Sequence, residues 1–274
     1  MRFITPALLA LLLTSCFTAG PIRSARHQQR PAAPTSSKVP PMPPLPSAPV
    51  EAPRVTSQTV SGIRFDGVAF DARSHRLVVV DQANGPGSEF ADSAAAAKFV
   101  GGLAAINAGF FTPEGQPLGQ VIAHGKPLGA WNNASSLGSG LWFETTAGNS
   151  AITRRRELDP AVAINELIQA GPLLVKNCHA VTGLESIKIS ARSVILWDGG
   201  SRWWIGHSSP CSLAALAQSL TAGQPAGWPV RYALNLDGGR SSDLWISGSI
   251  AGDPVVIRPP WNKPVRNFLV LVDR

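Results

Sequence analysis

The chain contains few of the residues that build metal and thiol chemistry. It has three cysteines and five histidines in 274 residues, and no Cys-x-x-Cys or His-Glu-x-x-His spacing occurs. We therefore predict no cofactor, with a divalent metal left open. No Gly-x-Ser-x-Gly segment is present either, which argues against a serine hydrolase with a nucleophile elbow.

The folded part of the chain also lacks a strong excess of either charge. The formal net charge is +7, but residues 17–54 hold five Lys and Arg against one acid, whereas residues 55–274 hold 18 against 16. A nucleic-acid-binding domain is expected to carry a concentrated basic surface. We therefore predict no nucleic-acid partner.

The apolar run at the start is too short to span a bilayer. MRFITPALLALLLTSC has one Arg, an apolar core over residues 7–13 and then Leu-Thr-Ser-Cys, which predicts a secretory signal peptide over residues 1–15. The end of this run resembles a bacterial lipobox, so we expect Cys16 to be acylated and to anchor the protein to a membrane. The alternative is a chance cysteine inside a cleaved signal. With the lipobox, the predicted location is the bacterial cell envelope, with the protein facing the periplasm or the outside.

A tether and a single domain are predicted to follow the signal. Ten of the 24 prolines lie between Pro21 and Pro53, and residues 16–54 have no hydrophobic period, so they are expected to form an extended spacer. Residues 55–274 are enough for one domain with a sizeable core. In an oxidising compartment, Cys178 and Cys211 are predicted to form a disulfide. Two unrelated buried thiols are the alternative.

Short strand-like runs dominate this domain, which predicts an α+β fold with a large mixed or antiparallel sheet and few helices. The runs are 77–80, 103–106, 120–123, 141–144, 172–175, 192–197, 202–206, 231–236, 243–247 and 267–272. The turn 198–201 is expected to join two of them into a hairpin. Helices are predicted over 90–100, beginning near Asp92 or Ser93, over the segment after Ser209 as N-cap, and over 159–168.

The segment YALNLDGGRSSDLWI carries the strongest chemical signal. Asp237 ends an apolar strand, and Gly238 and Gly239 permit a close backbone approach and positive φ. Arg240, Ser241 and Ser242 follow. The amides of such a turn, its hydroxyls and an arginine are suited to binding an anion such as phosphate. The alternative is a hairpin turn with ordinary polar turn residues.

Three further clusters end or begin apolar strands. In AAINAGFF, Asn107 is placed to orient a substrate hydroxyl or a carboxylate, or to close an Asx-turn. IQAGPLLVKN contains Gln169 and Gly171, and Arg192 opens RSVILW as a ligand or as a surface charge.

Taken in order, these segments resemble the phosphodiester glycosidase family. The matching motifs are INAGFF, VIAHGK, IQAGPLLV, ARSVI, ALNLDGGRSS and PVRNFLVLV, over about residues 60–274. The family includes the uncovering-enzyme domain, an N-acetylglucosamine-1-phosphodiester alpha-N-acetylglucosaminidase, and exported bacterial members. The chain has Arg240 where the family commonly has Gly or Pro, and Cys178 where it usually has Gly.

The resemblance implies cleavage of a sugar–phosphate diester at the anomeric carbon. Asp237 would act there as the carboxylate, and Asn107 would orient it or a substrate hydroxyl. Arg192 and the Gly238–Ser242 turn would hold the phosphate. The implied contacts to substrate also include Gly109, Phe110, Gln169 and Gly171. The implied partner is a sugar phosphate or an envelope glycan, and Trp131 and Trp261 are candidates for stacking on a sugar.

Two other functions remain open. One is a non-catalytic glycan-binding lipoprotein of the same fold, which the Arg240 departure favours. The other is a serine hydrolase that uses Ser241 or Ser242.

Overall fold

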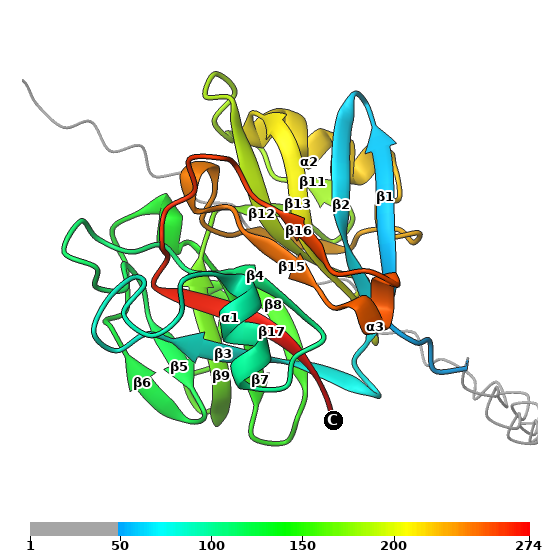
Figure 1. Ribbon diagram of the computed structural model, residues 1–274. Helices are drawn as coiled ribbons and strands as arrows, with labels where there is room; N and C mark the ends of the chain where they lie inside the picture. Colours follow the sequence, from blue (N-terminus) through cyan, green and yellow to red (C-terminus); the bar gives the residue numbers. More distant parts are fainter. Residues whose placement is uncertain (1–48) are drawn as a thin grey trace, which may run out of the picture. The chain divides into compact units, whose positions relative to one another are not determined.

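Three antiparallel β-sheets organise the computed structural model, which describes residues 49–274 (Figure 1). The predicted signal peptide, Cys16 and most of the tether lie outside the described residues. The first sheet has seven strands, in the order β1 (Arg54–Val60), β2 (Ile63–Asp71), β13 (Arg202–Cys211), β12 (Ser190–Trp197), β14 (Tyr232–Asn235), β10 (Leu173–Lys176) and β11 (His179–Ala180).

The other two sheets have five strands each. The second has the order β16 (Val255–Ile257), β15 (Leu244–Ile246), β4 (Ala104–Asn107), β17 (Asn267–Asp273) and β3 (His75–Asp81). The third has the order β6 (Lys126–Leu128), β5 (Val121–Ala123), β9 (Ile164–Ala170), β7 (Gly140–Thr145) and β8 (Ser150–Arg154). This confirms the α+β prediction and specifies that the strand pairs are antiparallel.

Helices are few and short. The α-helices are α1 (Ser93–Phe99), α2 (Leu213–Ala222) and α3 (Gly248–Ala251), and the 3-10 helices are η1 (Ser136–Gly138), η2 (Arg155–Glu157) and η3 (Gly239–Ser241). None of the helices in residues 49–274 is long and apolar enough to cross a membrane.

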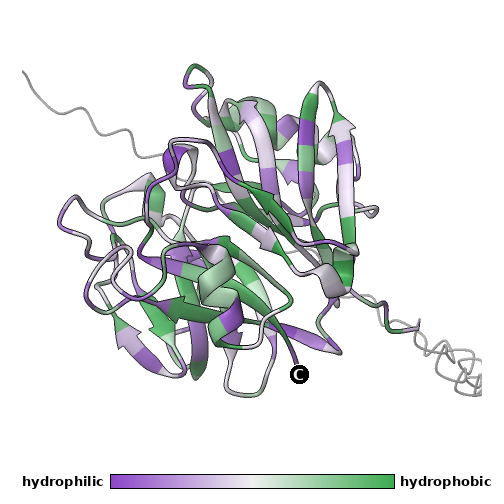
Figure 2. Ribbon diagram, in the orientation of Figure 1, coloured by the Kyte–Doolittle hydropathy of each residue, from purple (hydrophilic) through white to green (hydrophobic). Residues whose placement is uncertain are grey.

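The main hydrophobic core receives side chains from all three sheets. Ile195 of β12, Leu269 of β17 and Ile168 of β9 are all fully buried in it. Smaller clusters lie under α2 on the first sheet and under α1 on the second. Buried strands therefore read as continuous apolar runs, such as FLVLV in β17, whereas β1 and β2 mix polar and apolar residues (Figure 2).

The strand predictions are confirmed, but one helix prediction is wrong and the predicted start of another helix is wrong. Residues 159–168 were expected to be helical, yet Ile164–Ala170 form β9, which pairs with β5 and β7. The Asp-Pro start is misleading because the Asp159 side chain accepts a hydrogen bond from the Ala161 amide and closes a turn instead.

The second helix begins later than predicted. Ser209 was expected to cap it, but Ser209 is still part of β13, and its hydroxyl accepts a hydrogen bond from the Arg64 amide. The cap is Ser212, whose hydroxyl accepts from the Ala215 amide at 3.2 Å. Because β13 pairs with its neighbouring strands as far as Cys211, Ser209 lies in the strand and cannot cap the helix. The helix predicted over 90–100 is confirmed as α1, with Asp92 as its N-cap.

The predicted disulfide is wrong, because Cys178 and Cys211 are both free. Cys178 follows β10, which is three strands away from β13 and its Cys211, or about 14 Å across the sheet. The two cysteines also lie near opposite ends of β12. Cys211 pairs with Ser190 at the start of β12, whereas Lys176, two residues before Cys178, lies across β14 from Trp197 at the end of β12. A disulfide requires α-carbons within about 7 Å of each other.

Candidate active site

A cavity of about 1020 Å³ opens at one end of the first sheet. Its walls are the segment that leads into β12, the turn after β14, the loop after β16 and one side of η1. In Figure 1 the first three are the yellow-green loop at the top, the orange η3 and the red segment beside it. The Asp-Gly-Gly-Arg segment is therefore part of a cavity wall. It does not close a hairpin, because β14 and β15 belong to different sheets.

Asp237 lines this cavity at the point where the chain leaves β14. Burial raises the pKa of its carboxyl group from 3.8 to about 6, which is partly offset by hydrogen bonds from the Ser241 hydroxyl and the Gly238 amide and by the Lys188 ammonium. The Gly238 amide donates to Oδ1 of Asp237 at 2.9 Å. A carboxyl group with a pKa near 6 exchanges protons readily near neutral pH, as a general acid or base must.

Asn107 positions the backbone of Asp237 and does not line the cavity. Its Nδ2 donates to the backbone carbonyl of Asp237 at 2.6 Å, and its Oδ1 accepts from the Ser193 hydroxyl at 2.6 Å and the Asp243 amide at 3.0 Å. Asn107 is completely buried. The Asp237 amide also donates to the carbonyl of Ala108 at 2.9 Å. The INAGFF and LDGGRSS motifs thus act as one unit in which the first holds the second in place.

Each of the two glycines after Asp237 has its own structural reason. A Cβ on Gly238 would lie 2.7 Å from the carbonyl oxygen of Ala191, so no side chain fits there. Gly239 has φ +64°, which L-residues adopt at a cost. Within the described residues, the amides of Gly239 and Arg240 donate no hydrogen bond. The turn therefore packs against the start of β12 and leaves two backbone donors for a ligand.

Three cations border the cavity without an ion pair within 4 Å among the described residues: Lys188, Arg192 and Arg240. Glu185 also borders the cavity, and its carboxylate interacts electrostatically with Lys188 and Arg192. Arg258 also lines the cavity, but it pairs with Asp92 at 3.0 Å and lies 3.8 Å from Asp243. Its charge is thus already compensated. The other three remain available to a negatively charged ligand.

Arg192 is buried and partly structural. Its guanidinium donates to the carbonyls of Lys188 at 2.9 Å and of Cys211 at 3.2 Å. Burial lowers the pKa of this guanidinium, but arginine remains charged at neutral pH. Within residues 49–274, its Nη1 makes no hydrogen bond. Arg192 therefore fixes the loop before β12 and keeps one nitrogen for a ligand.

Five of the other predicted residues do not line the cavity. The Gln169 side chain uses both of its polar atoms within the protein: Oε1 accepts from the Gln120 and Asn132 amides, and Nε2 donates to the Asn132 and Gly138 carbonyls. These hydrogen bonds fix the segment that precedes η1. The Gly109 amide donates to Oδ1 of Asn267, and the Gly171 carbonyl accepts from Asn235. Ser241 bonds to Asp237, and Ser242 is completely buried. Phe110, by contrast, lines the cavity.

Lys188, His207 and Asn235 are among the polar residues of the cavity that the sequence reasoning missed. Asn235 is 2% exposed, and its Oδ1 has no hydrogen-bond partner in the structure. Burial lowers the pKa of His207, because it disfavours the charged ring. A polar residue inside the apolar strand ALNL was the available signal for Asn235. Among the described residues, no three His, Cys, Asp or Glu side chains converge on a point where they could hold a metal.

Comparison with protein families gives a match over residues 101–272 to the model described as phosphodiester glycosidase. None of the curated protein sequences matches the chain.

Several solved structures share the fold. One is the catalytic domain of zebrafish N-acetylglucosamine-1-phosphodiester alpha-N-acetylglucosaminidase, auto-inhibited by its pro-peptide. It has 20% identity and a TM-score of 0.58, and the match covers 84% of this chain and 86% of that one. A hypothetical protein from Synechocystis has 17% identity and a TM-score of 0.53, with 81% and 61% covered. A protein of Burkholderia pseudomallei K96243, described as exported, has 13% identity and a TM-score of 0.55, with 77% and 74% covered.

Proposed function

Because the chain belongs to the phosphodiester glycosidase family, we propose that it hydrolyses a sugar–phosphate diester at the anomeric carbon. The observation that carries the proposal is the composition of the cavity wall. One partly buried carboxyl group, Asp237, lies in the same cavity as Lys188 and Arg192, neither of which forms an ion pair within 4 Å among the described residues. Glu185 also lines the cavity, but its carboxylate accepts hydrogen bonds from the Ile187 and Lys188 amides.

Different residues stabilise the phosphate leaving group and the sugar when the bond between them breaks. The C–O bond at the anomeric carbon breaks, and its electron pair leaves with the phosphate monoester. Arg192, Lys188 and the free amides of the Gly238–Ser242 turn stabilise that charge. The phosphate is already a weak base, so it needs an anion site more than it needs a proton donor.

The sugar end carries the developing positive charge. The ionised carboxylate of Asp237 stabilises an oxocarbenium-like transition state and accepts the proton of the attacking water. The unpartnered Oδ1 of Asn235 supports a role as acceptor for a sugar hydroxyl. Asn107 acts through Asp237 as a positioning residue.

The test is release of free sugar from a sugar 1-phosphate diester, such as UDP-N-acetylglucosamine or a methyl diester. We expect turnover by the wild type and a loss of at least 100-fold in the Asp237→Asn protein, because an amide accepts no proton. Asp253→Asn, a substitution of an exposed aspartate outside the cavity, is the matched control and should keep full activity. An Asp237→Asn protein as active as the control would overturn the mechanism.

A glycan-binding protein without turnover is the second candidate. Arg240 favours it, since this cation borders the cavity where the family commonly has Gly or Pro, and its Nε donates to the carbonyl of Trp261 at 3.2 Å. Under the enzyme proposal, Arg240→Gly should leave the rate unchanged or raise it. A wild type that binds the diesters but cleaves none of them would select the binding function.

We propose further that the enzyme is anchored to the cell envelope through acylated Cys16, with residues 16–54 as a spacer. The lipobox-like sequence supports this. In the native host, Cys16→Ala should abolish incorporation of labelled fatty acid and release the protein from the membrane fraction. Unchanged retention, together with no label on the wild type, would exclude the anchor.

A further inference from the structure

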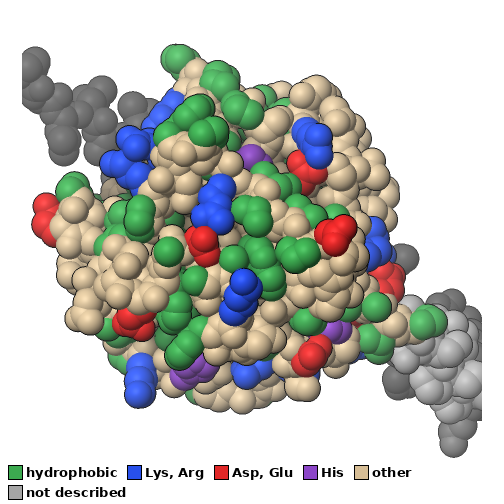
Figure 3. Space-filling model, in the orientation of Figure 1, with side chains coloured by type: hydrophobic (Ala, Val, Ile, Leu, Met, Phe, Trp, Pro, Cys, Tyr) green, Lys and Arg blue, Asp and Glu red, His purple; other side chains and the backbone are tan. Residues whose placement is uncertain are grey.

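The mouth of the cavity carries two exposed apolar side chains, Ile189 and Trp261, and a third, Ile187, precedes Ile189 in the same loop. Ile187 and Ile189, in the loop before β12, are 87% and 63% exposed, and Trp261 in the loop after β16 is 62% exposed. Ile189 and Trp261 also line the cavity, together with Leu137 of η1 and Leu213 at the start of α2. Figure 3 shows hydrophobic side chains over the loop at the top of the view, with Lys and Arg side chains beside them. Apolar side chains that are exposed together at a cavity are typical of a binding surface.

The charges and the apolar side chains follow one another along the chain. Lys188 lies between Ile187 and Ile189, and Arg192 follows three residues later on the cavity wall. On the other side, Arg240 contacts the backbone of Trp261. A ligand whose phosphate lies among the cations would therefore direct its next substituent toward the isoleucines and the indole.

We propose that this substituent is an alkyl chain, so that the substrate is a sugar 1-phosphate esterified to a hydrophobic alcohol. The inference rests on the proposed function, because it identifies the aglycone of the same diester. Its charged part matches the cations of the cavity, and its chain matches the apolar mouth.

A second sugar fits this mouth less well than an alkyl chain. Of the three exposed side chains, two are aliphatic, and Trp261 offers one N–H donor and no acceptor. A sugar placed over them would cover several hydroxyls without giving each a partner, which costs free energy. An alkyl chain has no such requirement, and each methylene that it buries increases affinity about fourfold.

The experiment compares kcat/KM on methyl, hexyl and mannosyl esters of one sugar 1-phosphate, using the full chain below the critical micelle concentration of each ester. We expect the hexyl ester to exceed the methyl ester at least tenfold. The double variant Ile187→Thr/Ile189→Thr, which keeps β-branched side chains at exposed positions, should reduce this hexyl-to-methyl ratio to below threefold. Val256→Thr is the matched control, because Val256 is 49% exposed and does not line the cavity, and it should keep the wild-type ratio.

The outcomes separate this inference from the proposed function. If the methyl or mannosyl ester is cleaved as well as the hexyl ester, the alkyl aglycone is overturned while the hydrolase stands. If no ester is cleaved, the proposed hydrolase activity is rejected. The affinity of alkyl phosphates then tests whether the mouth of the cavity binds an alkyl chain. In that case octyl phosphate should bind at least tenfold more tightly than methyl phosphate by calorimetry, and equal affinities would overturn the alkyl site.

Discussion

At the scale of single residues, Asp237 controls how activity depends on pH. Its pKa is raised to about 6 because burial disfavours the charged form. The proposed mechanism needs the ionised carboxylate, which is protonated below that pKa. Activity should therefore be lost as the pH falls, not as it rises.

We expect kcat/KM to reach half of its neutral value near pH 6 and to fall about tenfold for each further pH unit below. The measurement is a rate profile from pH 4.5 to 8 on one diester. A profile that is flat over this range in the folded wild type would contradict the assignment.

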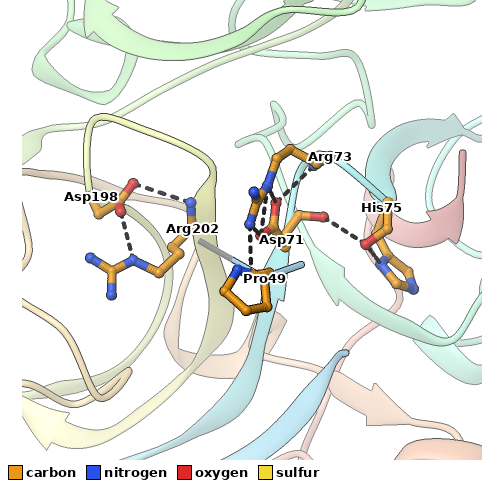
Figure 4. A network of polar contacts seen from close by, with 7 residues as sticks. Pro49, Asp71, Arg73, His75, Asp198 and Arg202 are labelled. Atoms are coloured by element: carbon orange, nitrogen blue, oxygen red, sulfur yellow. Dashed lines mark hydrogen bonds and ion pairs between the residues drawn. The ribbon is translucent and has the colours of Figure 1, made fainter. Parts of the chain in front are cut away.

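At the scale of elements, an acidic network secures the end of the first sheet away from the cavity. Asp71 ends β2, is 1% exposed and accepts hydrogen bonds from Nε and the amide of Arg73, while Asp198 binds Arg202 on the neighbouring strand (Figure 4). The hydrogen bond from the Arg73 side chain is the largest cause that lowers the pKa of Asp71, from 3.8 to about 2.

Ionisation of Asp71 stabilises the folded state, whereas ionisation of a buried, unpaired acid destabilises it. Because the folded pKa lies below the unfolded one, the ionised form stabilises the fold above pH 3.8, and this stability is lost as the pH falls toward 2. Asp71→Asn should lower the free energy of unfolding by about 2 kcal/mol at pH 7. The loss should shrink toward zero near pH 2. Urea denaturation at several pH values measures it, and an equal loss at every pH would show that packing, not charge, is responsible.

The two cysteines belong to different elements, which predicts different reactivity. Cys178 is exposed in the turn between β10 and β11, whereas Cys211 is buried at the end of β13. Burial also raises the pKa of the Cys211 thiol, so little thiolate is present at neutral pH.

In the Cys16→Ala protein, a maleimide reagent should label one thiol, Cys178, in the folded state without reductant, and both remaining thiols after unfolding. Peptide mapping identifies the modified residue. Labelling of neither thiol in unreduced, unfolded protein would show that the chain forms the disulfide that the structure excludes.

At the scale of the whole molecule, the site lies where the chain crosses from the first sheet to the second. Asn107 ends β4 of the second sheet, yet it bonds to Ser193 of β12 and to Asp237 after β14, both on the first-sheet side. Its amide and side chain also pair with the backbone of Asp243, just before β15. One side chain thus connects two sheets and the proposed catalytic carboxylate.

We expect Asn107→Ala to lower kcat much more than it changes KM, because Asp237 would lose the contact that positions it. The variant also leaves buried partners unpaired, which should cost roughly 2–4 kcal/mol of stability. Steady-state kinetics well below the melting temperature separate the two effects. Unchanged kcat in a folded variant would contradict the positioning role.

The sequence alone predicted ten of the strands in residues 49–274, the α+β class and the two main motifs of the site. A short, continuous apolar run such as FLVLV is buried on both faces, so it can be predicted as a strand without knowing which strands pair with it. Asp237, Gly238 and Gly239 were also recognisable, because an arginine and two serines follow them, which is more than a hairpin turn requires. Family membership followed from the same motifs.

Tertiary structure decided what depends on which segments meet. Residues 164–170 became a strand because β5 and β7 pair with them, and the local sequence carries no record of that pairing. The sheet order separated Cys178 from Cys211 by three strands. The same order brought Lys188, His207 and Asn235 into one cavity with Asp237, although the local sequence around Lys188 and His207 differs little from that of ordinary surface or core residues. Local propensity is a property of neighbours along the chain, whereas a site is formed by contacts between residues far apart in sequence, which only the folded chain brings together.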